Sequence, residues 1–219
     1  MLRAVIFDLN GVIIDDEKIH QKAWRQFCKK NGLNLTKNDY RQKVFGRTAK
    51  DTLKYLYKNQ LTEDKLNQLA SERIDIAIEM IKTKLKLPGG LKKLLALLNK
   101  NKISLAIATS SRARYVDFVT DKTKIRKHFK LIVTAQDVNK GKPYPEIYLK
   151  TAGKLKVDPN DCVVFEDSIQ GVMAAKKAGM KVIAITTTHT KIELKQADKV
   201  IKSFTEVDYL MLKEALSHT

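Results

Sequence analysis

Four short polar segments in this 219-residue chain combine residue types that suit phosphoryl chemistry. Three follow apolar runs and one stands in a loop; they are Asp8 after Val5-Ile6-Phe7, Thr109-Ser110 after 105–108, Lys142 in 139–143, and Glu166-Asp167 after Val163-Val164-Phe165. Taken singly, such an acid is a common helix cap and such a Thr-Ser pair a common turn. The combination is more specific, because it supplies a nucleophilic carboxylate, hydroxyl donors, a fixed cation and an acid pair.

Phosphoryl transfer needs mainly positioning and charge stabilisation, because the transferred group spreads its charge over several oxygens. Mg²⁺ is a hard cation that takes oxygen ligands from one or two carboxylates, and Asp8 and Asp167 would provide them. Asp8 would also attack phosphorus and form an aspartyl-phosphate, a known form of covalent catalysis. Lys142 would offset the charge of Asp8 and the phosphate, while Thr109 and nearby amides would bind phosphoryl oxygens.

The elements that must position these groups alternate in type after the break at Pro88-Gly89-Gly90. The patterns predict strands at 4–7, 103–108, 131–134, 162–165, 182–185 and 200–201, and helices at 91–98, 145–154, 168–178 and 206–216. Alternating elements of this length predict an α/β fold with a doubly wound parallel sheet and helices on both faces. In such sheets, ligands bind at the carboxyl ends of the strands, where the four polar segments stand.

The stretch from about Glu17 to Leu85 has helical periodicity throughout, so we interpret it as an insert after the first strand. The predicted division is an α/β core formed by 1–15 and 86–219, with an inserted α-helical cap domain at 16–85. The cap would lie over the edge of the sheet that carries the polar segments.

The composition, with 43% hydrophobic residues, is that of a globular protein, and no run approaches the roughly 18–20 apolar residues of a membrane span. The net charge of +18 comes from scattered basic residues, which favours attraction of phosphorylated anions over a nucleic-acid site. Two distant cysteines, Cys28 and Cys162, predict no disulfide framework. We therefore expect a cytoplasmic monomer that binds a small phosphorylated metabolite and neither nucleic acid nor membrane.

The four segments, in this order, resemble the motifs of the haloacid dehalogenase superfamily, within its β-phosphoglucomutase-like group with a helical cap. The resemblance rests on the motifs Phe7-Asp8-Leu9-Asn10-Gly11-Val12, Ala108-Thr109-Ser110, Gly141-Lys142-Pro143 and Phe165-Glu166-Asp167-Ser168 with Gly171. It implies a Rossmann-like core, an aspartyl-phosphate and a cap that opens and closes. It also implies Mg²⁺ held by Asp8, the main-chain carbonyl of Asn10 and Asp167, with Glu166 beside them.

Asn10 departs from the family pattern Asp-x-Asp, whose second acid moves the proton. An amide cannot relay a proton, and general acid–base catalysis is worth about 10² to 10⁴ in rate. Three interpretations stay open: a deliberate substitution that traps a complex, a naturally slow enzyme or binding protein, or an acid nearby that replaces the missing one. Asp15 and Asp16 are candidates for that acid, although we expect them to cap the first cap helix.

His20 and Trp24 lie four residues apart and so share one face of the first cap helix. His20 is either a site residue, as the resemblance implies, or a surface residue. In the resembling mutases a cap-loop Arg binds a second phosphate, but Ala49 takes that position here. The expected substrate-binding residues are Ser110, Ser111, Arg112, His20, Arg47 and Lys50, with Arg73 as a further cation.

These features favour a phosphatase of small phosphorylated metabolites, with sugar phosphates as the expected class. A β-phosphoglucomutase-type mutase is the alternative enzyme, and a weakly catalytic phosphate-ligand-binding protein is the alternative outside enzymes.

Overall fold

The computed structural model describes residues 1–217 and arranges six parallel strands in one sheet, in the order β3-β2-β1-β4-β5-β6. The strands are β1 (Ala4–Phe7), β2 (Ser104–Ala108), β3 (Leu131–Val133), β4 (Cys162–Glu166), β5 (Lys181–Ile185) and β6 (Lys199–Ile201). The predicted α/β fold with a doubly wound parallel sheet is confirmed. The strand order reverses between β1 and β4, and ligands of such sheets bind at this point.

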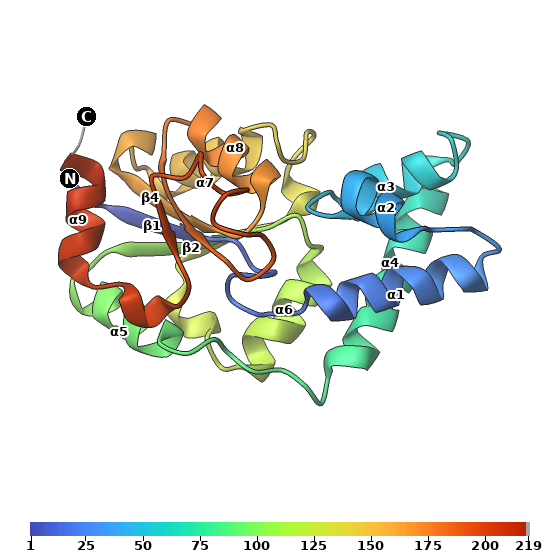
Figure 1. Ribbon diagram of the computed structural model, residues 1–219, viewed down its shortest axis with the longest axis horizontal. Coiled ribbons are helices and arrows are strands. Elements are labelled where there is room, and N and C mark those ends of the chain that lie inside the picture. Colours follow the sequence, from blue (N-terminus) through green and yellow to red (C-terminus); the bar gives the residue numbers. More distant parts are fainter. Residues whose placement is uncertain (218–219) are drawn as a thin grey trace.

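Helices cover both faces of the sheet, α5 and α6 on one side and α7 and α8 on the other (Figure 1). The core helices are α5 (Leu91–Lys100), α6 (Ala113–Lys122), α7 (Glu146–Leu155), α8 (Ile169–Lys177) and α9 (Tyr209–Ser217). Side chains of β1 alternate between the two resulting cores, with Val5 and Phe7 in one and Ala4 and Ile6 in the other. Because both faces are buried, the central strands read as continuous apolar runs.

The register of the central strands brings the polar segments to one edge. Phe7 lies opposite Ile107 of β2 and Phe165 of β4, so Asp8 and Thr109 emerge beside Glu166. The N-terminus of the helix after β4 is fixed by Ser168, whose hydroxyl accepts from the Gly171 amide at 3.0 Å. Such a cap satisfies one of the otherwise unpaired amides of the first helical turn.

A helical unit lies beyond the carboxyl edge of the sheet (Figure 1). It consists of α1 (Glu17–Lys30), α2 (Lys37–Asp39), the π-helical turn Tyr40–Val44, α3 (Ala49–Leu56) and α4 (Glu63–Ile81). Its own apolar cluster includes Trp24, Phe27, Leu53 and Leu66. We propose on this basis that 16–85 is a cap domain, although the second half of α4, with Ile74 and Ile81, packs into the core cluster.

The predicted strands and helices are present, with ends shifted by one to three residues at most sites. Helix α6 was not predicted, although Tyr115, Val116 and Val119 have helical spacing and are fully buried. The last helix begins at Tyr209 rather than at 206, because a 3₁₀ turn occupies Phe204–Glu206. In the described part of the chain, no helix combines the length and apolarity that crossing a bilayer requires.

Candidate active site

Asp8 and Lys142 form a buried ion pair at the carboxyl edge of the sheet. The Lys142 ammonium lies 2.8 Å from Asp8 Oδ1 and 2.5 Å from Glu166 Oε1. Burial disfavours the charged lysine, but the two carboxylates outweigh it and hold the pKa of Lys142 well above its ordinary value. Burial raises the pKa of Asp8 to about 7 against the opposing effect of Lys142. One ammonium thus serves two buried carboxylates.

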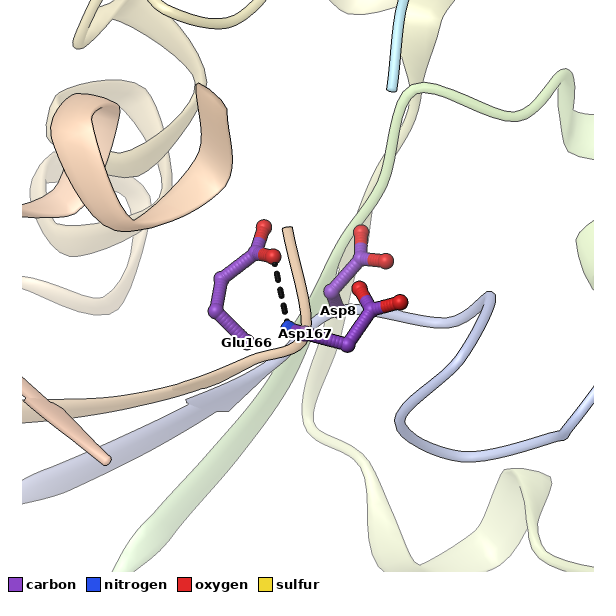
Figure 2. A group of neighbouring side chains, drawn as sticks. All are labelled: Asp8, Glu166 and Asp167. Atoms are coloured by element: carbon purple, nitrogen blue, oxygen red, sulfur yellow. Dashed lines mark hydrogen bonds between the residues drawn. The ribbon is translucent and has the colours of Figure 1, made fainter. Parts of the chain in front are cut away.

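Asp167 adds a third buried carboxylate to this edge. Asp8, Glu166 and Asp167 each offer an oxygen, and these oxygens lie within 4.8 Å of one another. Figure 2 shows the carboxylates of Asp8 and Asp167 side by side, while Glu166 extends away from them. Burial, together with the charges of Glu166 and Asp8, holds the pKa of Asp167 well above its ordinary range. Ionising all three carboxyl groups beside one ammonium would leave an excess of negative charge, so burial and this repulsion together raise the pKa values of Asp8 and Asp167.

This donor set fits a hard divalent cation such as Mg²⁺, which prefers carboxylate oxygens and relieves repulsion between them. Glu166 is the least free of the three, because its oxygens already accept from Lys142, the Tyr148 hydroxyl, two backbone amides and Ser168 Oγ. We therefore expect Asp8 and Asp167 to be the ligands and Glu166 to orient Lys142.

Gly11 and Gly171 let the backbone approach these carboxylates closely. A Cβ on Gly11 would lie 1.9 Å from Asp167 Oδ2, and one on Gly171 would lie 1.8 Å from Glu166 Oε1. Gly11 also has a φ of +76°, in the left-handed region that favours glycine. A Cβ at either position would clash with a carboxylate, so steric contact explains why both motifs contain a glycine.

Asn10 belongs to a network of hydrogen bonds rather than facing solvent. Its amide donates to Asp16 Oδ2 at 2.7 Å, and its carbonyl oxygen accepts from Ser111 Oγ at 2.6 Å. The Tyr115 hydroxyl donates to the same Asp16 oxygen at 2.5 Å. Our expectation that the Asp16 side chain caps α1 is wrong. Asp16 occupies the N-cap position, but its side chain makes no capping bond and turns into this network, while Asp15 is exposed.

His20 is buried and lines the cavity, so the surface position that the sequence left open is wrong, and we propose His20 as a site residue. Its Nδ1 lies 2.6 Å from Arg73 Nη2. Since arginine only donates, Nδ1 accepts from Arg73, while Nε2 lies 2.9 Å from the Asn10 amide nitrogen and 3.1 Å from Asp16 Oδ2. Burial and the Arg73 charge lower the pKa of His20, which favours the neutral ring.

A cavity of about 90 Å³ separates the sheet edge from the helical unit. Its lining includes most of the predicted residues, namely Asp8, Asn10, His20, Arg47, Thr109, Ser110, Ser111, Arg112, Lys142 and Asp167. Lys50 lies outside this lining, because its ammonium pairs with Glu63 at 2.8 Å. Ala49 lines the cavity at the position where the resembling mutases carry an arginine.

Several residues that line the cavity or contact its carboxylates were not predicted from the sequence. Thr188 follows β5 and donates to Asp167 Oδ2 at 2.5 Å; its position after a strand was the signal that could have found it. Glu17 and Tyr40 also line the cavity, as does Trp24, which the sequence predicted only to share a helix face with His20. Tyr148, which donates to Glu166 at 2.7 Å, gave no signal because it looks like a helix core residue.

Comparison with known proteins agrees with this geometry. A phosphorylated carbohydrates phosphatase from Thermotoga maritima is 32% identical over 82% of this chain and 83% of its own. A validoxylamine A 7'-phosphate phosphatase from Streptomyces hygroscopicus subsp. limoneus is 29% identical over 94% and 96%. The structure of β-phosphoglucomutase from Clostridium difficile superposes with a TM-score of 0.87 and 26% identity, covering 99% and 97% of the two chains.

The model of the haloacid dehalogenase-like hydrolase family matches residues 5–185, which include all four polar segments. The chain belongs to the haloacid dehalogenase-like hydrolases.

Proposed function

We propose that this chain is a Mg²⁺-dependent phosphatase of small phosphorylated metabolites, with sugar phosphates as the main class, and that it acts through an aspartyl-phosphate on Asp8. The observation that carries the proposal is the Asp8 carboxylate on the floor of the cavity, 2.8 Å from the Lys142 ammonium and beside Asp167. This arrangement suits nucleophilic attack on a bound phosphoryl group.

In the first step, an Asp8 oxygen bonds to phosphorus while the bond from phosphorus to the ester oxygen breaks. The leaving oxygen takes up a proton from solvent water and departs as an alcohol. In the second step, a water oxygen bonds to phosphorus and gives up a proton to solvent while the bond from Asp8 to phosphorus breaks, which releases inorganic phosphate and restores Asp8. Lys142 remains charged throughout, and the hydroxyls of Thr109 and Ser110, which line the cavity, bind phosphoryl oxygens.

Asp8, Asp167 and the main-chain carbonyl of Asn10 would hold Mg²⁺. Bound there, the ion would neutralise phosphoryl charge and lower the repulsion between phosphate and nucleophile. Glu166 would keep Lys142 in place through its contact at 2.5 Å.

Asn10 limits the proton transfers in both steps. Its amide keeps the hydrogen bonds to Asp16 and Ser111, so the geometry is preserved, but it cannot carry the proton. We expect slow turnover of substrates with poor leaving groups. A phosphate-ligand-binding protein is the limiting case, in which the second step does not occur.

Names of relatives support the substrate class, since one is a phosphatase of phosphorylated carbohydrates and another removes phosphate from validoxylamine A 7'-phosphate. Arg47 and Arg112 also line the cavity, and their charges would attract a phosphorylated anion.

Release of inorganic phosphate from a panel of sugar and polyol phosphates, with and without Mg²⁺, tests the proposal. We expect Mg²⁺-dependent release that is lost in Asp8→Ala and retained in Asp117→Ala, a surface aspartate on α6. Release that persists in Asp8→Ala would contradict the assigned nucleophile.

A mutase is the second candidate, because the structure resembles β-phosphoglucomutase with a TM-score of 0.87. Formation of glucose 6-phosphate from β-glucose 1-phosphate, exceeding phosphate release, would favour it. Ala49 in the cavity lining argues for the phosphatase, since no cation is available at that position to hold a second phosphate.

A further inference from the structure

The cap side of the cavity carries polar groups that the proposed phosphoryl chemistry does not use. Glu17 from the first turn of α1, Tyr40 from the π-helical turn and Arg73 from α4 line it together with Trp24. The phosphoryl group would occupy the floor beside Asp8, so these side chains would face the other end of the substrate.

These side chains form one wall of the cavity, and negative charge is disfavoured there. Burial raises the pKa of Glu17 to about 8, against a hydrogen bond with Tyr40, and the neighbouring charges of Asp16 and Asp15 add to the rise. The raised pKa favours the protonated form of Glu17 near neutral pH, even with Arg73 nearby. A substrate carboxylate placed here would meet the same burial and the same two acids.

Arg73 offers an unused donor in the wall. Its side chain is buried, with 5% of its surface exposed, and its guanidinium lies 4.8 Å from the centre of the Trp24 ring. One amino group is held by His20, but within residues 1–217 its Nε has no hydrogen-bond partner. A buried donor without a partner costs free energy that a ligand acceptor would recover.

A hydroxyl group matches this wall because it both accepts and donates. Its oxygen can accept from the Arg73 guanidinium, which lines the cavity, and its proton can be donated to the carboxyl oxygen of Glu17 or to the Tyr40 oxygen. A carboxylate can only accept, and it brings a charge next to Asp15 and Asp16. Arg47 and Arg112 attract anions of every kind to the cavity. Selection between a hydroxyl group and a carboxylate at the non-phosphorylated end of the substrate must therefore come from the buried wall.

We propose that Glu17, Tyr40 and Arg73 bind hydroxyl groups at the non-phosphorylated end of the substrate and reject a carboxylate there. The chain then selects polyol and sugar phosphates over phosphorylated acids of the same length. This inference rests on the proposed function, because it assumes that the phosphoryl group binds beside Asp8.

Two pairs of ligands that differ only in the terminal group test the inference. They are glycerol 3-phosphate with 3-phosphoglycerate, and sorbitol 6-phosphate with 6-phosphogluconate. Binding to the unmodified protein in the presence of Mg²⁺ is measured by calorimetry, which does not depend on the proton transfer that Asn10 lacks. For the pair whose length reaches Glu17, we expect the hydroxyl ligand to bind about tenfold more tightly or better, since like-charge contacts penalise the acid.

Variants distinguish the contribution of the wall residues to the ligand preference from the general effect of removing a charge. Glu17→Ala should reduce the preference at least about threefold, because the carboxyl partner of the hydroxyl is lost. Glu17→Gln remains neutral with a donor and an acceptor, so it should keep most of the preference. Glu79→Ala removes an exposed glutamate of α4 that pairs with Lys82, and the preference should not change.

Equal binding within both pairs, tighter binding of either acid, or a preference that Glu17→Ala leaves intact would overturn the inference. The proposed function fails by a different result, namely phosphate release that does not require Asp8. Binding of both ligands of a pair without any turnover would leave the ligand preference measurable and identify a binding protein.

Discussion

In the proposed function, Asn10 keeps the geometry of the site and removes part of its chemistry. Its amide fills the position of an acid and joins Asp16, Ser111 and, through Asp16, Tyr115 in one buried network. An aspartate at position 10 would lie about as close to Asp16 as the amide does, at 2.7 Å. Two carboxylates at that distance share a proton, which is the state that a general acid requires.

Asn10→Asp should therefore raise turnover of sugar phosphates by about 10² to 10⁴, the usual contribution of a positioned acid or base. The steady-state rate of phosphate release measures the effect. Asn34→Asp adds the same charge at an exposed position of the helical unit and should leave the rate unchanged. An unchanged rate in Asn10→Asp would show that residue 10 does not limit proton transfer.

The raised pKa of Glu17 makes the stability of the folded protein depend on pH. Its pKa is raised by burial from 4.5 in the ordinary state to about 8 in the folded protein. Between these values the folded state keeps a proton that the unfolded state loses, so stability falls as pH rises through this window and then levels off.

Glu17→Gln removes that titration. Relative to the unmodified protein, the variant should gain stability steadily from about pH 5 to pH 8, on the order of a few kcal/mol at most. Urea unfolding at pH 5, 7 and 9 measures the difference. A stability difference that is the same at pH 5 and pH 7 would contradict a raised pKa at Glu17.

At the scale of elements, the loop after β1 sets the distance between the nucleophile and Asp167. Gly11 and Gly32 both have positive φ, +76° and +66°, but only Gly11 faces a neighbour, since nothing lies within 4 Å of a Cβ on Gly32. The pair separates the cost of the backbone conformation from that of the contact.

Gly11→Ala and Gly32→Ala should each cost about 1–2 kcal/mol of stability for the left-handed conformation. Gly11→Ala should in addition displace Asp167 and lower phosphate release at limiting Mg²⁺, with partial recovery at higher Mg²⁺. Thermal unfolding and a Mg²⁺ titration of activity measure the two effects. Similar activities in the two variants would show that Gly11 is not needed to position Asp167.

Among the elements, the sheet could be predicted from the sequence. Apolar runs followed by polar residues indicated both the strands and the edge where Asp8, Thr109 and Glu166 meet, because parallel strands share their carboxyl edge. The orientation of the side chains at the start of helix α1 could not be predicted from such a pattern. Asp16, Glu17 and His20 occupy neighbouring positions on it, and its sequence alone does not tell which of them faces the core.

At the scale of the whole molecule, the cavity exists because the helical unit lies against the core. Phe45 of the helical unit packs on His189 of the core with ring centroids 5.1 Å apart, and a Cβ on Gly46 would lie 3.3 Å from Gln170. These contacts join segments more than 120 residues apart, so no local pattern reports them. The proposed roles of Glu17 and Tyr40 followed only from this packing, whereas the sequence had already indicated Arg73 as a candidate cation.

The central claim is that phosphate passes through Asp8 and that Asn10 slows its release. Reaction with p-nitrophenyl phosphate and Mg²⁺ tests it directly, because this leaving group needs no proton and the first step stays fast. The account predicts a stoichiometric burst of p-nitrophenolate before a slow steady rate, with the phosphoryl group found on the Asp8 peptide after acid quench and no burst in Asp8→Ala. A burst that survives in Asp8→Ala, or turnover that leaves no phosphoryl group on Asp8, would contradict the account.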